Sequence, residues 1–330
     1  MSRPPARAGR PRVVVTRRLP EPVEARLLEL FDARLNPADR LLGAAELADA
    51  VRSADGLLST VTDRITAEVL AAAPRRARIV ANFGVGCDHI DLAACAEAGI
   101  AVTNTPDVLT DDTADAAMTL ILAVARRAGE GERHLRAGAW TGWRPTHLLG
   151  TRVTGKTLGI VGMGRIGRAV ARRAHAGFGM RILFHTRGPV PQADLAAAAA
   201  ERCDGIDELL AASDVVSLHC PATPETRHLI DGARLARMRP GAILVNTARG
   251  SVVDEGALVQ ALRAGRIAGA GLDVYEDEPR VPPALLAMEN VVLLPHLGSA
   301  TTESRVAMGE RAVANLAAFF RGEPPPDRVV

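Results

Sequence analysis

A glycine-rich hexapeptide near the middle of the chain carries the clearest chemical signal in the sequence. It consists of Gly162-Met163-Gly164-Arg165-Ile166-Gly167, between a short apolar run at 158–161 and a helical pattern at 168–176. At a strand-to-helix turn, the first glycine of such a motif makes the turn, the second lets backbone approach a pyrophosphate, and the third lets the helix pack on the strand. The free N–H groups at the helix start then face the anion. The motif predicts a dinucleotide-binding loop in preference to glycines that only punctuate a turn.

The end of the next predicted strand bears on the choice of cofactor. An Asp or Glu about 20 residues beyond the glycine loop is typical of NAD sites, because it accepts hydrogen bonds from the ribose 2′-OH. This chain has Thr186 and Arg187 there. A guanidinium and a hydroxyl can bind a 2′-phosphate through charge-assisted hydrogen bonds, so the pattern favours NADP(H), with NAD(H) possible. The alternative is that Arg187 is an ordinary solvated loop arginine.

Two series of short β-branched runs must position these residues. The first has predicted strands at 13–15, 56–59, 79–82 and 100–103, with helical patterns at 23–31 and 92–98. The second has predicted strands at 158–161, 182–185, 215–218, 243–246, 268–272 and 291–294. Strands that alternate with helices imply βαβ units and parallel sheets, and runs that are apolar on both faces are typical of strands covered by helices.

The length of 330 residues favours two domains over one. A long helical pattern at 111–135 separates the two series, and a last one at 302–320 is too short to be a domain, so we expect it to fold back onto the N-terminal unit. The alanine-rich run 196–200 is expected to be helical. We therefore predict an α/β protein with two Rossmann-like parallel-sheet domains. The NAD(P)-binding domain, residues 107–298, is inserted in a discontinuous substrate domain, residues 1–106 and 299–330.

Composition excludes several classes of partner. The 40 basic and 38 acidic residues are interspersed and leave a net charge of +2, so nucleic acid is not expected to bind. The longest apolar run, 116–125, is well short of the roughly 20 residues of a membrane span. Residues 1–12 are basic and proline-rich with no apolar run behind them, which predicts a flexible extension and not a signal peptide. The four cysteines show no Cys-x-x-Cys spacing, so we expect a cytoplasmic protein without a bound metal or disulfide.

Four further segments resemble, in order, the motifs of the D-2-hydroxyacid dehydrogenase family. They are NTPDVLTDDTAD at 104–115, NTARG at 246–250, GLDVYEDEP at 271–279 and LPHLGSAT at 294–301. The resemblance covers nearly the whole chain from about residue 12 and is closest to the glyoxylate/hydroxypyruvate reductases, or D-glycerate dehydrogenases. It implies an enzyme that reduces a small 2-oxo acid, glyoxylate or hydroxypyruvate, to the D-2-hydroxy acid (glycolate or D-glycerate) by hydride transfer from NAD(P)H.

The chemistry of that reaction agrees with three residues in these segments. Reduction of a 2-oxo acid requires a cation that holds the carboxylate and polarises the ketone, a proton donor and a hydride source. Arg249 follows a predicted strand, and its planar guanidinium can bridge carboxylate and carbonyl oxygens. His296 follows another strand and is the expected general acid. Glu278 would hold the imidazole and favour its protonated form. His89 and His219 are weaker rivals near strand ends, as is His185.

The resemblance also implies binding roles. The backbone N–H groups of Val85 and Gly86 are expected to hold the substrate carboxylate. Cys87 stands beside them where related sequences often have a larger or β-branched residue, which leaves the choice of 2-oxo acid open. Asp273 is expected to hold the nicotinamide carboxamide and Thr113 a cofactor phosphate. The other implied cofactor positions are Cys220 and Pro221 beside the adenine, Thr226, Ala248 and Gly298.

The segment 139–145 holds both tryptophans, Trp140 and Trp143, among turn-forming residues. It is expected to be an extended arm. The tryptophans could pack on their own subunit. The resemblance favours a homodimer in which each arm crosses to its partner and Trp143 approaches the neighbouring active site, where it would limit substrate size.

Two alternatives remain open at this point. The chain could be another member of the family, of the phosphoglycerate, phosphite or formate dehydrogenase type, although little more than one helix follows His296. It could also be a cofactor-sensing binding protein like the corepressors that share this fold.

Overall fold

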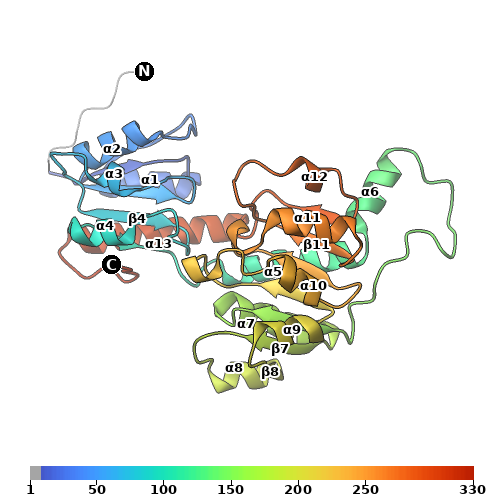
Figure 1. Cartoon of the computed structure of the whole chain (residues 1–330). Coiled ribbons are helices and arrows are strands. Elements are labelled where there is room, and N and C mark those ends of the chain that lie inside the picture. The colour runs from blue at the N-terminus through green and yellow to red at the C-terminus, as the bar shows by residue number, and fades with distance from the viewer. Residues whose placement is uncertain (1–8) are drawn as a thin grey trace. The chain divides into compact units, whose positions relative to one another are not determined.

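The computed structural model describes residues 9–330 and divides them into two compact units (Figure 1). The first unit runs to Leu109 and includes Thr301–Val330, and the second is Thr110–Ala300. Of the N-terminal extension predicted at residues 1–12, the first eight residues lie outside the described part, and Arg12 already belongs to a strand.

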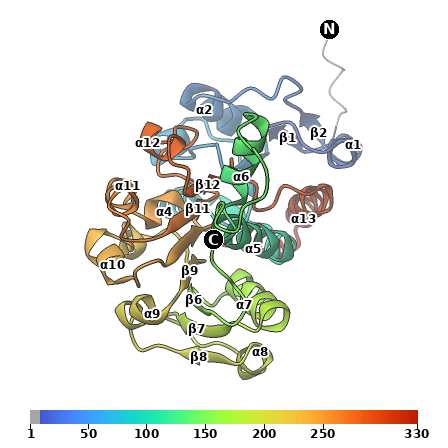
Figure 2. The same ribbon diagram turned by 90° about the vertical axis from the view of Figure 1, so that its right-hand side faces the viewer.

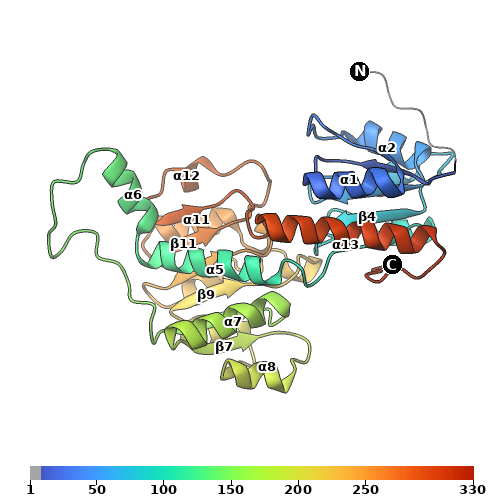
Figure 3. The ribbon, with the colours of Figure 1, turned by 180° about the vertical axis from the view of Figure 1, so that it is seen from behind.

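The first unit is a five-stranded, fully parallel sheet in the order β2-β1-β3-β4-β5. The last helix of the chain, α13, packs on α1 and on β4, which confirms that the C-terminal segment folds back onto the N-terminal unit (Figure 3). The elements are β1 (Arg12–Val15), α1 (Glu21–Leu30), β2 (Asp32–Arg34), α2 (Ala44–Ser53), β3 (Gly56–Thr60), α3 (Ala67–Leu70), β4 (Ile79–Phe83), α4 (Leu92–Glu97), β5 (Ala101–Thr103) and α13 (Thr302–Phe320).

The second unit is a seven-stranded parallel sheet in the order β12-β11-β10-β9-β6-β7-β8. Its elements are α5 (Thr110–Ala125), α6 (Ala128–Arg136), β6 (Thr157–Val161), α7 (Arg165–Phe178), β7 (Arg181–His185), α8 (Gln192–Ala197), β8 (Ala200–Arg202), α9 (Ile206–Ala212), β9 (Val215–Leu218), the 3-10 turn η1 (Pro224–Thr226), α10 (Gly232–Arg237), β10 (Ile243–Asn246), the 3-10 turn η2 (Gly250–Val252), α11 (Glu255–Arg263), β11 (Gly269–Leu272), α12 (Pro283–Leu286) and β12 (Val291–Leu293). Strand order reverses between β6 and β9, and the carboxyl ends of strands at such a switch point are where open α/β sheets bind ligands.

Helices cover both faces of this sheet (Figure 2). Side chains of α5 and α7 form one apolar core against it, and side chains of α9, α10 and α11 form the other. Central strands such as β10, with all four residues buried, are therefore apolar on both faces, as the sequence predicts. The predicted fold class, with a parallel-sheet domain inserted in a discontinuous one, is confirmed.

Some element boundaries differ from the sequence prediction. The helix predicted at 111–135 is broken at Arg127, which has φ 52° and separates α5 from α6. The Ala125 carbonyl accepts the N–H of Thr151, so the returning chain takes the place of the next helical turn. The alanine run 196–200 is helical only to Ala197, where α8 ends, and Ala200 already belongs to the strand β8. The prediction missed two strands, β2 and β8. Both missed strands have three residues, too few for a periodic signal.

Within residues 9–330, no helix combines the length and the apolar character needed to cross a membrane.

Candidate active site

The glycine loop has the geometry that a pyrophosphate requires. Gly162 has φ +96°, and a Cβ there would lie 2.7 Å from the Cys220 nitrogen, so the turn between β6 and α7 admits only glycine. A Cβ on Gly167 would lie 2.2 Å from the Gly162 oxygen, whereas one on Gly164 would meet no atom within 4 Å. The loop is therefore tight on its inner side and open at Gly164. No side chain caps the start of α7, so the loop leaves room and N–H donors for an anion.

Two arginines lie near the end of β7. Thr186 and Arg187 follow the strand, and Arg187 is exposed and close enough to Cys220 to lower the pKa of its thiol, although burial raises that pKa to about 11 overall. The guanidinium of Arg202, on β8, donates a hydrogen bond to the Thr186 oxygen and lies 5.8 Å from the centre of the Phe184 ring. Arg202 was missed by sequence reasoning because β8 was not predicted. Only the pairing of β7 with β8 brings it beside Thr186.

Other predicted cofactor residues are held within their own turns. The buried Asp273 accepts hydrogen bonds from the N–H groups of Leu297 and Gly298, at 2.6 and 2.8 Å. Burial raises the pKa of Asp273 more than these hydrogen bonds lower it. The Thr226 hydroxyl donates to the Pro221 oxygen, 2.7 Å away, and accepts from the Thr223 N–H.

Thr113, on α5, lies beside Gly298, because a Cβ on that glycine would stand 3.4 Å from the threonine methyl. Thr113 and Asp273 thus border the same turn. Roles toward a cofactor remain predictions for these residues.

Arg249, Glu278 and His296 follow three neighbouring strands. Arg249 comes after β10, Glu278 after β11 and His296 after β12, and these strands are adjacent and parallel. Their carboxyl ends lie at one edge of the sheet, so the structure brings the three residues to the same side of the second unit.

The loop after β10 is fixed from both sides. Asn246 donates to the Arg249 oxygen at 2.8 Å and accepts from the Ala248 N–H at 3.0 Å. A Cβ on Gly250 would lie 1.8 Å from the Tyr275 carbonyl carbon, so this loop packs backbone to backbone on the segment that carries Glu278. The Arg249 guanidinium donates to the Ala248 oxygen at 2.8 Å.

His296 and Glu278 form a hydrogen-bonded ion pair. His296 Nδ1 lies 2.8 Å from Glu278 Oε2, and the side chains are 30% and 35% exposed. Glu278 Oε1 accepts the Tyr275 N–H at 3.1 Å. Burial raises the pKa of Glu278, but the hydrogen bond and charge of His296, the Tyr275 N–H and the charge of Arg249 together hold it below its ordinary value. Because Glu278 takes Nδ1, Nε2 is the ring nitrogen that can present a proton to a substrate.

The backbone at His296 is unusual for a residue with a side chain. Its φ is 56°, in the left-handed region, and its N–H donates to the Asp273 oxygen at 2.9 Å. Such conformations are uncommon outside glycine and cluster at functional sites. The rival histidines are engaged elsewhere: His185 with the Cys203 oxygen, His219 with Ser217 and His89 with Asn82.

Val85 and Gly86 belong to the first unit, in the loop 84–87 that follows β4. Both are partly exposed, and the Val85 oxygen accepts from Asn104 Nδ2 at 2.9 Å. The buried Asn82 donates to the oxygens of Gly84 and Gly86. The sequence prediction gave neither asparagine a role, although Asn104 begins the segment 104–115 and Asn82 ends the predicted strand 79–82.

The arm 139–145 contains neither helix nor strand and reaches away from the sheet of its unit (Figure 1). Trp143 is 81% exposed and Trp140 is 53% exposed, so neither tryptophan is buried on its own chain. Leu135 and Leu149, on either side of the arm, are exposed as well.

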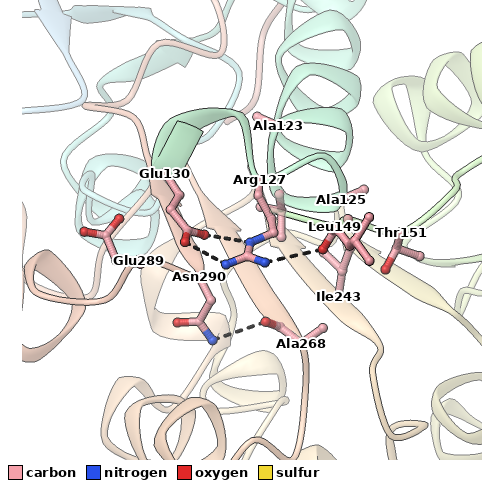
Figure 4. Close-up of a pocket in the computed structure, with 12 residues that line it drawn as sticks. Ala123, Ala125, Arg127, Glu130, Leu149, Thr151, Ile243, Ala268, Glu289 and Asn290 are labelled. Atoms are coloured by element: carbon pink, nitrogen blue, oxygen red, sulfur yellow. Dashed lines mark hydrogen bonds and ion pairs between the residues drawn. The ribbon is translucent and has the colours of Figure 1, made fainter. Parts of the chain in front are cut away.

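A pocket of about 460 Å³ lies at the opposite edge of the same sheet (Figure 4). It is lined by residues at the amino ends of strands, including Ile243, Ala268 and Asn290. Arg127 forms a bidentate ion pair with Glu130 inside it. Its charged groups are paired, and it is remote from Arg249, Glu278 and His296, so we do not place the chemistry there.

Comparison with known proteins agrees with these observations. The family model for the NAD binding domain of D-isomer specific 2-hydroxyacid dehydrogenases matches residues 118–298. A glyoxylate reductase of Thermococcus kodakarensis is 50% identical over 97% of this chain and 96% of its own length. The crystal structure of a glyoxylate reductase from Paecilomyes thermophila has a TM-score of 0.86 at 36% identity and covers 97% of this chain and 98% of that one.

An NADPH-dependent glyoxylate/hydroxypyruvate reductase of Sinorhizobium meliloti, solved with NADP and malonate, has a TM-score of 0.87 at 39% identity. It covers 98% of this chain and 97% of its own. The parallel sheets, the glycine loop and the full-length similarity together establish that this chain belongs to the D-isomer specific 2-hydroxyacid dehydrogenase family.

Proposed function

We propose that this chain reduces glyoxylate and hydroxypyruvate to glycolate and D-glycerate, with NADPH preferred over NADH. The observation that carries the proposal is the pair of His296 and Glu278, with Arg249 on the neighbouring strand end of the same sheet edge. The relatives named above as glyoxylate reductases, similar over their full lengths, support the same substrate class.

The three residues have separate tasks in this proposal. The guanidinium of Arg249 binds the substrate carboxylate and polarises the 2-oxo group, and the N–H groups of Val85 and Gly86 also donate to the carboxylate. A bound nicotinamide cofactor supplies the hydride. His296 then gives the proton on Nε2 to the developing alkoxide, while Glu278 stabilises the imidazolium and holds its orientation.

The cofactor preference rests on charge near the end of β7. No carboxylate follows the strand, where Asp or Glu would repel a 2′-phosphate, and Arg187 and Arg202 lie near Thr186. The open backbone at Gly164 and the start of α7 would hold the pyrophosphate, with Arg165 and Ile166 in the first helical turn. Cys220, Pro221, Thr226, Ala248 and Gly298 would line the rest of the cofactor, with Thr113 on a phosphate and Asp273 on the carboxamide.

We further propose a twofold homodimer through the arm 139–145. Four large apolar side chains are exposed between residues 135 and 149, and burial of such side chains against a second copy would remove them from water. Trp143, the most exposed of them, would reach the partner and border its substrate site.

Steady-state kinetics on glyoxylate, hydroxypyruvate, pyruvate and a bulky 2-oxo acid, each with NADPH and NADH, test the function. We expect high kcat/KM for the first two with NADPH. His296→Ala should lower kcat by about 100-fold or more with little change in cofactor KM, since general acids typically contribute 10²–10⁴-fold. Arg249→Ala should damage both KM and kcat.

The matched control is His175→Ala, because His175 lies on α7 and its ring hydrogen-bonds to the Met180 backbone oxygen, away from the catalytic residues. It should leave turnover unchanged. Near-normal turnover of His296→Ala would show that another group is the acid. Feeble reduction of every 2-oxo acid by the unmodified protein would favour a corepressor-like binding protein.

A further inference from the structure

The loop 84–87 in the first unit has each of its carbonyl oxygens held by a donor. Asn82 Nδ2 donates to the oxygens of Gly84 and Gly86, at 3.0 and 2.9 Å, and the Thr105 N–H also donates to the Gly84 oxygen, at 3.0 Å. Asn104 Nδ2 donates to the Val85 oxygen at 2.9 Å, and the Ile90 N–H donates to the Cys87 oxygen. Asn82 is fully buried and Asn104 is half-buried, so the Asn82 donor comes from inside the unit.

This arrangement decides where the N–H groups of the loop point. The C=O of one residue and the N–H of the next belong to one planar trans peptide and point in opposite directions. Holding the Gly84 oxygen inward therefore turns the Val85 N–H outward, and holding the Val85 oxygen does the same for Gly86. Neither of these two N–H groups has an acceptor within the described residues. Successive outward N–H groups form a concavity that suits an anion.

The orientation of Asn82 is itself fixed. Its two amide hydrogens point at two carbonyl oxygens, so its Oδ1 must face the remaining neighbour, His89 Nε2, at 3.1 Å. Because Oδ1 can only accept, His89 must carry a proton on Nε2. If the Asn82 amide were flipped, its oxygen would face two carbonyl oxygens and its NH₂ group would face the N–H of His89 Nε2. The hydrogen bond with His89 therefore stabilises the amide orientation that the loop requires.

We propose that Asn82 is the positioning residue for the substrate carboxylate. Through the Gly84 oxygen it turns the Val85 N–H toward a small monocarboxylate, and through the Gly86 oxygen it holds the other side of the loop, while Asn104 sets the Gly86 N–H. His89 holds the Asn82 amide in the required orientation. This inference rests on the proposed function, in which the N–H groups of Val85 and Gly86 bind that carboxylate. Asn82 acts through the loop and does not contact the reacting atoms.

Asn82→Asp tests the proposal, because it places a carboxylate oxygen against the Gly84 and Gly86 oxygens. The Gly86 oxygen then loses its asparagine donor, and the Gly84 oxygen, which keeps the Thr105 N–H, is repelled by the new charge. With the full-length enzyme, we expect KM for glyoxylate to rise about tenfold or more, the loss typical of a hydrogen bond to a charged group. The KM for NADPH should not change, since Asn82 belongs to the unit without the glycine loop. The preference for glyoxylate over its neutral methyl ester, as a ratio of kcat/KM values, should fall by a similar factor.

Two further variants separate positioning from general stability. His89→Gln keeps a donor for Asn82 Oδ1 and should keep the unmodified KM, whereas His89→Leu should raise it. Thr103→Val is the matched control, because the Thr103 hydroxyl is buried in the adjoining strand and has no hydrogen-bond partner among residues 9–330. It should leave the substrate preference unchanged.

The outcomes distinguish this inference from the proposed function. If the unmodified enzyme does not prefer glyoxylate over the ester, recognition of the carboxylate fails, and the proposed function with it. If it does, but Asn82→Asp keeps the same preference, only the positioning role of Asn82 is overturned. Should Asn82→Asp not fold, the two His89 variants decide, and equal KM values for them would overturn the proposal.

Discussion

His296 Nδ1 and Glu278 Oε2 are 2.8 Å apart, although 18 residues separate them in the chain. The two side chains meet because β11 and β12 are parallel neighbours, so the residues that follow both strands lie at the same edge of the sheet. Although burial raises the pKa of Glu278, the hydrogen bond and charge of His296 hold it below its ordinary value, so a negative carboxylate lies against the imidazole.

Glu278→Gln should therefore change the pH profile of reduction. The amide keeps a hydrogen-bond acceptor for Nδ1 but removes the negative charge, so the imidazolium gives up its proton at lower pH. Measured as kcat/KM for glyoxylate against pH, the alkaline limb should move downward by about one pH unit, the size of a typical effect of one neighbouring charge. An unmoved alkaline limb would mean that Glu278 does not control the proton donor.

Arg187→Ala should narrow the preference for NADPH over NADH by about 10- to 100-fold, because a charge-assisted contact contributes roughly 1.5–3 kcal/mol. Arg202→Ala should narrow it in the same direction. Arg181→Ala is the matched control, since Arg181 lies at the other end of β7 and pairs with Glu201. Equal kcat/KM with both cofactors in the unmodified enzyme would contradict the prediction.

Trp143→Ala should loosen the dimer and widen the substrate range toward bulky 2-oxo acids. The side chain is 81% exposed on the single chain, so its removal costs little within the subunit and should leave Tm of an isolated monomer unchanged. Light scattering at micromolar concentration and the 2-oxo acid panel measure the two effects. Leu41→Ala removes another exposed apolar side chain, 55% exposed, from the other unit as a control. A monomeric unmodified protein, with the same specificity in the variant, would exclude the crossing arm.

His219 makes stability depend on pH. Burial lowers the pKa of its imidazole to about 4, and its Nδ1 is buried without a partner while Nε2 lies 2.8 Å from the Ser217 hydroxyl. Below its ordinary pKa of about 6.5, the unfolded chain binds a proton that the folded chain refuses, so stability falls between pH 6.5 and 4. The unmodified protein should lose about 2 kcal/mol of unfolding free energy through His219 when the pH falls from 7 to 5. His219→Gln keeps a polar atom toward Ser217 and should abolish this part of the loss. Denaturant unfolding at both pH values measures this difference, and identical losses in the two proteins would refute it.

The sequence by itself determined the fold class, the glycine loop and the catalytic candidates. These signals are local: a GxGxxG motif between a strand and a helix, apolar runs of strand length, and motifs in which Arg249 and His296 closely follow a strand. In a parallel sheet, a position just after a strand already specifies an edge, and so the meeting of these residues could be expected from the order of elements alone.

Only the tertiary structure decided the features that depend on pairing between distant segments. Arg202 is found beside Thr186 because β8, too short to be predicted, pairs with β7. The helix predicted at 111–135 breaks at Arg127 because the N–H of Thr151, which follows the arm, donates a hydrogen bond to the Ala125 oxygen. Asn104 follows β5 and reaches the Val85 oxygen because β5 pairs with β4, whereas Asn82, in β4 itself, bonds residues just along the chain whose fold back toward it no periodic pattern shows. Hydrogen bonds between segments remote in sequence leave no periodic pattern, so the residues that orient a site are harder to predict than the residues that form it.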